Sequence, residues 1–147
     1  MTPYKEILSA DRVANLRKLA AKLLTVPESQ FDMDRFSYNP GESGMDSSCT
    51  VHQCGTIGCA VGWGPAAGVE AKDWDQDWWD YGHRVFISAD ESEAWDWCFS
   101  AGWSLTDNSP AGAARRILYL LDAGLPDDLY EQMEGDAPRC YDEVAAE

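Results

Sequence analysis

The chain has 147 residues, of which 45% are hydrophobic, and its formal net charge is −15. This length and apolar content fit one globular domain with its own core and exclude a chain that is disordered throughout. No apolar run reaches the 18 residues of a membrane-spanning helix, and the first six residues lack the apolar stretch of a signal peptide. We therefore expect a cytoplasmic protein.

The negative charge is unevenly distributed along the chain. Residues 1–69 carry a net charge of −1, whereas residues 70–147 carry −14. The acidic half should repel nucleic acid and anionic membranes but attract a basic protein surface, including one that normally holds DNA or RNA. The alternative is that the charge serves solubility alone. The five cysteines, an odd number, indicate reduced thiols rather than a disulfide framework.

In the first half, the spacing of apolar residues predicts two helices. Residues 10–24 form an amphipathic pattern that ends before Pro27. After a turn-like segment at 31–36 and a loop at 39–50, residues 56–67 have helical spacing, with Thr56 as a plausible N-cap. Three glycines weaken this second helix by up to about 1 kcal/mol each. We therefore expect it to be central and tightly packed.

In the second half, the elements are shorter and acidic. Residues 73–81 indicate an acidic aromatic loop, and residues 85–87 could form a short strand. A capping-box pattern at 88–91 predicts a helix that runs to Gly102. Ser109-Pro110 predicts the start of another helix, which ends at Gly124.

That last helix carries Arg115 and Arg116, the only basic pair of the acidic half, which we expect to form ion pairs with nearby acids. A short acidic helix follows at 127–134, and the last dozen residues are expected to be loosely docked. The predicted fold is a single domain over residues 1–147, mainly α, with about five helices around a central Gly/Cys-rich helix. It has at most a small β-hairpin, and an α+β composition is the alternative.

A cluster of thiols and imidazole is the first candidate site. Cys49, His52, Cys54 and Cys59 have the spacing C-x2-H-x-C-x4-C, and these ligand types suit tetrahedral zinc. The spacing differs from that of a zinc knuckle, however, and a reduced cysteine is more often a small buried hydrophobe. We therefore expect no cofactor and keep zinc as the alternative.

The same segment carries the alternative of a thiol enzyme. Cys54 precedes a predicted helix start, where the helix dipole would lower a thiol pKa, and His52 is an available base. No cysteine-hydrolase signature, phosphate-binding loop or nucleophile elbow occurs in the chain. We therefore expect no catalytic residue and a protein that is not an enzyme.

The acidic aromatic segment is the second candidate site. It contains Asp73, Trp74, Asp75, Asp77, Trp78, Trp79 and Asp80. The alternating aspartates do not form an EF-hand loop, because Trp78 stands where that loop requires glycine. Trp78 and Trp79 are adjacent and cannot both face one core, so one of them should be exposed. Because tryptophan is enriched at binding hot spots, we predict that these seven residues contact a protein partner. A Trp-lined pocket that sequesters a small ligand is an alternative.

Several short motifs resemble a family of small bacteriophage and bacterial proteins of uncharacterised activity. The matching pieces are Phe31-Asp32-Met33, Cys54-Gly55-Thr56-x-x-Cys59-x-x-Gly62-Trp63, the Trp-rich stretch from Trp97 to Trp103, and Ala113-Ala114-Arg115-Arg116-Ile117. This resemblance implies an origin among phage accessory genes, many of which bind and redirect a host protein. Such a protein would act in the host cytoplasm.

Together, these patterns lead to one hypothesis of function. The chain is expected to be a non-enzymatic accessory protein that binds a host or defence protein with a basic surface. In one version its carboxylates imitate nucleic-acid phosphates. The protein itself should contact neither nucleic acid nor membrane.

Overall fold

A computed structural model describes residues 2–33, 37–38, 57–58, 60–70, 72 and 78–143, with the backbone alone at 37–38 and 57–58. Within these residues the fold is mainly α-helical, as predicted. The α-helices are α1 (Ala10–Leu23), α2 (Trp78–Val85), α3 (Ser92–Phe99), α4 (Pro110–Ala123) and α5 (Leu129–Glu134). The 3-10 helices are η1 (Tyr4–Glu6), η2 (Glu28–Gln30), η3 (Val61–Trp63), η4 (Pro65–Ala67), η5 (Ala101–Leu105) and η6 (Cys140–Glu143).

The strand content is a single antiparallel pair within the described part of the chain. Strand β1 (Ser37–Tyr38) pairs with β2 (Ile57–Gly58), so that Ser37 lies opposite Gly58 and Tyr38 opposite Ile57. A pair of two-residue strands contributes little stability on its own, so the helices dominate the fold.

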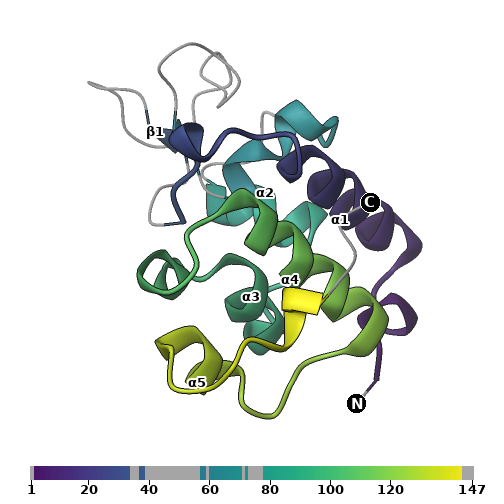
Figure 1. Cartoon of the computed structure of the whole chain (residues 1–147). Helices are drawn as coiled ribbons and strands as arrows, with labels where there is room; N and C mark the ends of the chain where they lie inside the picture. Colours follow the sequence, from purple (N-terminus) through teal and green to yellow (C-terminus); the bar gives the residue numbers. More distant parts are fainter. Residues whose placement is uncertain are drawn as a thin grey trace.

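Helix α4 organises the fold, because it lies between α1 on one side and α3 on the other (Figure 1). Its start follows the sequence prediction: Ser109 Oγ accepts a hydrogen bond from the Gly112 amide at 3.0 Å, and Pro110 occupies the first helical position. It ends at Gly124, whose φ of 95° favours glycine. Helix α1 is also confirmed, and Ser9 Oγ caps it by accepting from the Arg12 amide at 3.3 Å.

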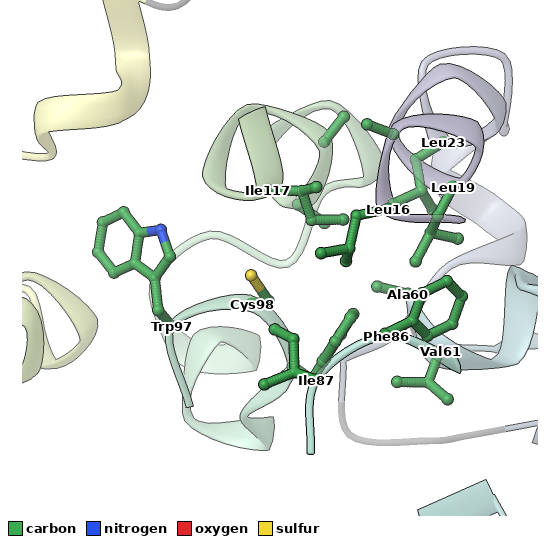
Figure 2. Close-up of a cluster of buried hydrophobic side chains, with 14 of the residues drawn as sticks. Leu16, Leu19, Leu23, Ala60, Val61, Phe86, Ile87, Trp97, Cys98 and Ile117 are labelled. Atoms are coloured by element: carbon green, nitrogen blue, oxygen red, sulfur yellow. The ribbon is translucent and has the colours of Figure 1, made fainter. Parts of the chain in front are cut away.

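The core has one part around the leucines of α1 and another around Trp97 of α3. Leu16, Leu19 and Leu23 of α1 are fully buried and face Ile117 of α4 (Figure 2). Trp97 of α3 is also fully buried, but its ring points away from this leucine cluster. Trp97 packs instead with Trp103, Tyr119 and Tyr141. Another buried aromatic ring, Phe86, lies with the aliphatic side chains (Figure 2).

The prediction of a central helix at 56–67 is wrong. Where the structure describes this segment, it forms β2 and then η3 and η4. The physical reason is the high glycine content together with Pro65, which has no N–H for an α-helical bond. The Gly64 amide instead donates to the Val61 carbonyl at 2.9 Å, a 3-10 bond. The predicted burial is confirmed, since Ala60, Val61 and Trp63 are at most 2% exposed.

The elements from 78 to 102 also differ from the sequence predictions. Residues 78–81 are helical rather than a loop, and Val85 ends α2 instead of beginning a strand. Trp78, Tyr81 and Val85 are buried, and their helical spacing places them on one apolar face. That face, rather than strand propensity, determines the local structure.

The capping box at 88–91 is not formed. Residues 88–91 make a turn, and α3 begins at Ser92 without a side-chain cap from Glu91. The helix ends at Phe99 rather than Gly102, because Ser100 is extended and its Oγ accepts from the Gly102 amide at 3.0 Å. This bond starts η5 as a separate turn.

Among the residues described, the longest helices have 14 residues, and none is long and apolar enough to cross a membrane.

Candidate functional site: an acidic aromatic face

The two adjacent tryptophans of α2 have opposite environments, as predicted. Trp78 is 4% exposed and its ring meets Tyr81 edge-on, with centroids 5.6 Å apart. Trp79 is 49% exposed. Trp78 therefore contributes to the core, whereas Trp79 presents aromatic surface to the outside.

Trp79 is held against a stack of aromatic rings. Its ring lies on Trp95 of α3, with centroids 5.2 Å apart and planes 24° apart. The His83 imidazole lies 4.0 Å from Trp95 and 5.5 Å from Trp79, and its Nδ1 is 2.9 Å from the Ile87 carbonyl oxygen. These contacts limit the side-chain entropy that Trp79 would lose on contact with a partner.

An acidic residue directly follows each of the two stacked tryptophans in the sequence, Asp80 after Trp79 and Asp96 after Trp95. Asp80 and Glu93 are exposed, and Asp96 is partly exposed one turn along α3 from Glu93. The Tyr130 hydroxyl, from α5, donates to Asp96 Oδ2 at 2.9 Å, and its side chain is 45% exposed. We give the name acidic aromatic face to the exposed or partly exposed residues Trp79 and Asp80 of α2, Glu93 and Asp96 of α3, and Tyr130 of α5.

The charges of this face act on Tyr130. The hydrogen bond to Asp96, followed by burial and by the charges of Asp96 and Glu93, raises the pKa of Tyr130 above its ordinary value. Tyr130 thus stays neutral at physiological pH and keeps a donor beside the carboxylates. The sequence does not single out Glu93, Asp96 and Tyr130, because the hydrogen bond between Tyr130 of α5 and Asp96 of α3 is a tertiary contact without a local signal.

Most of the sequence-predicted site residues fall outside the described part of the chain. These are Asp73, Trp74, Asp75 and Asp77 of the partner-binding set, and Cys49, His52, Cys54 and Cys59 of the alternative zinc set. Within the described residues, no group of three or more His, Cys, Asp or Glu side chains is placed to hold a metal ion. Zinc and thiol chemistry at Cys54 therefore stay predictions.

Both cysteines of the described part are free thiols. Cys98 is fully buried, and burial raises the pKa of its thiol far above the ordinary value, although the charge of Arg116 acts in the opposite direction. Cys98 therefore forms no reactive thiolate near neutral pH. Cys140 is half-buried and accepts a hydrogen bond from Tyr119, whose pKa rises to about 12 through burial and this bond.

A second polar cluster lies inside the core beside the rings of Trp103 and Tyr141. Arg116 is fully buried, and its Nη1 donates to Asp107 Oδ2 at 3.2 Å, which confirms the predicted ion pairing for this arginine. Tyr141 is also fully buried, and its hydroxyl donates to the same carboxylate oxygen at 2.7 Å. The prediction that this terminal segment is loosely docked is therefore wrong at Tyr141.

The comparisons with known proteins add no relative to this description. The chain matches no protein-family model, no curated protein sequence and no solved structure.

Proposed function

We propose that this protein is a non-enzymatic, phage-type accessory protein that binds a basic surface of a host or defence protein through the acidic aromatic face. The observation that carries the proposal is the half-exposed Trp79, which is stacked on Trp95 and is followed in α2 by the exposed Asp80. A fixed aromatic ring among acids combines buried contact area with long-range attraction.

The charge distribution supports a basic partner. Residues 70–147 carry a net charge of −14, and α2, α3 and α5 belong to this half. Such a field accelerates association with a positive surface and disfavours acidic partners. In the nucleic-acid-mimicry version, Asp80, Glu93 and Asp96 would occupy the phosphate pockets of a DNA- or RNA-binding protein.

Salt-dependent capture tests this proposal. The immobilised wild-type protein is compared with a variant that neutralises the face by Asp80→Asn, Glu93→Gln and Asp96→Asn. A matched control neutralises three exposed carboxylates elsewhere, by Asp11→Asn, Glu28→Gln and Glu70→Gln, and so has the same net charge. Proteins retained from a bacterial lysate are identified by mass spectrometry at low and at high salt.

We expect the wild type and the control to retain the same basic protein at low salt and to release it as the ionic strength rises. The face variant should retain at least about tenfold less of it, since each lost close charge pair weakens binding. Equal retention of the basic protein by the two variants, or capture that does not change with salt concentration, would contradict the proposal.

A further inference from the structure

Tyr141 of η6 fills a space between two tryptophan rings. Its side chain is fully buried and meets Trp97 edge-on at 5.5 Å and 82°, and Trp103 at 5.7 Å and 88°. This edge-to-face arrangement is the preferred geometry of aromatic pairs. The two indoles thus form an aromatic socket around a single phenol ring.

The far end of this socket is polar and matches a phenol hydroxyl. The Tyr141 hydroxyl donates to Asp107 Oδ2 at 2.7 Å and accepts from Arg116 Nη1 at 3.0 Å. The Arg116 guanidinium lies 4.2 Å from the centroid of Trp103. Arg116 Nε and Nη2 are buried without a hydrogen-bond partner among the described residues. The polar end of the socket therefore has N–H donors that neither Tyr141 nor Asp107 accepts from.

The walls of the socket are held by contacts that do not involve Tyr141. The Trp97 indole donates to the Arg116 carbonyl at 2.9 Å, and the Trp103 indole donates to the Asp96 carbonyl at 3.2 Å. Asp107 also accepts from the Ser109 hydroxyl at 2.7 Å and pairs with Arg116. Because α3, η5, α4 and the residues between η5 and α4 supply these groups, each wall of the socket has contacts that do not depend on Tyr141.

Apart from the Tyr141 side chain, η6 and the residue before it are attached by three polar contacts within the described part of the chain. The Cys140 amide donates to Gln132 Oε1 at 2.9 Å, the Tyr119 hydroxyl is hydrogen-bonded to Cys140, and Arg139 Nη1 lies 3.5 Å from Asp107 Oδ2. A hollow of about 400 Å³ adjoins the segment that leads into η6. It is lined by Thr106, Gly135, Ala137, Pro138, Arg139 and Asp142. The segment therefore lies over a space instead of packing closely on η5.

We propose that Tyr141 is the intramolecular occupant of a phenol-binding socket, and that η6 is a strap whose release opens this socket to a phenolic ring from outside. The ligand class is a para-substituted phenol, either a tyrosyl side chain or a free phenol. The inference is independent of the acidic aromatic face, because the socket uses Trp97, Trp103, Asp107 and Arg116.

Chemical rescue tests the socket. Tyr141→Ala removes the ring and the hydroxyl of the occupant, and 4-methylphenol supplies both in one molecule. We expect 4-methylphenol to raise the melting temperature of this variant by at least about 3 °C. Toluene has the same ring without the hydroxyl and should raise it less, because Asp107 and Arg116 stay unsatisfied. Equal rescue by the two compounds, or no rescue of a folded variant, would overturn the proposal.

Hydrogen exchange on the wild-type protein tests whether η6 opens as a strap. It also tests the proposal if Tyr141→Ala does not fold. We expect the amides of 140–143 to exchange at least about 100-fold faster than those of 116–121 in α4. Adding 4-methylphenol should accelerate exchange at 140–143 alone. A Tyr-containing peptide is added in a separate experiment. The same acceleration with the peptide would identify a tyrosyl side chain as a ligand, and no acceleration would restrict the ligand to a free phenol. Exchange of 140–143 at the rate of α4 would show that no strap opens and would reject the proposal.

Discussion

At the scale of single residues, the most consequential interaction is the buried pair of Asp107 and Arg116. Burial alone would raise the pKa of Asp107, but hydrogen bonds from Ser109 and Tyr141 and the charges of Arg116 and Arg139 lower it below the ordinary value. Arg116 has no exposed surface. A buried charge that loses its partner is costly, so this pair should control stability.

Asp107→Asn should therefore lower the free energy of unfolding by about 3 kcal/mol, because it leaves the Arg116 charge uncompensated in the core. Urea denaturation at pH 7 measures this change. Asp122→Asn is the matched control, since Asp122 pairs with Lys5 at 3.3 Å on the surface. That variant should lose less than about 1 kcal/mol. Equal losses in the two variants would contradict a buried ion pair.

The same pair predicts a dependence on pH. Because the folded-state pKa of Asp107 lies below the unfolded value, ionised Asp107 stabilises the fold fully above the unfolded pKa, about pH 4. This contribution is lost as the pH falls through the folded-state pKa. The stability difference between the wild type and Asp107→Asn should hence be constant from pH 5 to 7 and shrink in more acidic solution. A difference that grows with acidity would refute the assignment.

At the scale of elements, sequence patterns predict the helices that have both a periodic apolar face and a side-chain cap. Helices α1 and α4 meet both conditions, with Ser9 and Ser109 as caps. The segment from 57 to 67 has helical spacing without helix-forming residues, and glycine and Pro65 turn it into β2 and 3-10 turns. Residues 88–91 have the sequence pattern of a capping box, but the helix starts at Ser92 in the packed protein. Such local signals fail where distant contacts decide.

Gly112 in the first turn of α4 provides a test at this scale. A glycine in a helix is normally improved by alanine, by about 1 kcal/mol. Here a Cβ on Gly112 would overlap the Asp107 carboxylate, with Asp107 Cγ only 2.6 Å away. Gly112→Ala should thus destabilise the protein in spite of its better helix propensity, by at least about 1 kcal/mol. Thermal denaturation measures the change.

The control for this prediction is Ala111→Gly, which lowers helix propensity at the neighbouring position without a clash. It should cost no more than about 1 kcal/mol. If Gly112→Ala instead stabilises the protein, the close approach of α4 to Asp107 is not as the structure describes it.

At the scale of the whole molecule, the charge asymmetry could be read from the sequence, but the composition of the acidic aromatic face could not. The sequence indicated that one of Trp78 and Trp79 is exposed, because adjacent residues point in different directions. It could not indicate which one, since that depends on the face that α2 buries. The stacking of Trp79 on Trp95 and the hydrogen bond from Tyr130 to Asp96 are tertiary contacts, and neither has a local signal in the sequence.

We propose that Trp79 is the aromatic contact through which the acidic aromatic face binds its partner. The most direct test of this proposal is the dissociation constant of the captured partner for the wild type, for Trp79→Ala and for Leu105→Ala. Leu105 is 94% exposed on η5 and lies outside the face, so it controls for the loss of exposed apolar surface. We predict that Trp79→Ala weakens binding by at least about tenfold, as truncation of a hot-spot tryptophan does, while Leu105→Ala leaves it unchanged. Unchanged affinity for Trp79→Ala, or an equal loss for Leu105→Ala, would contradict the account.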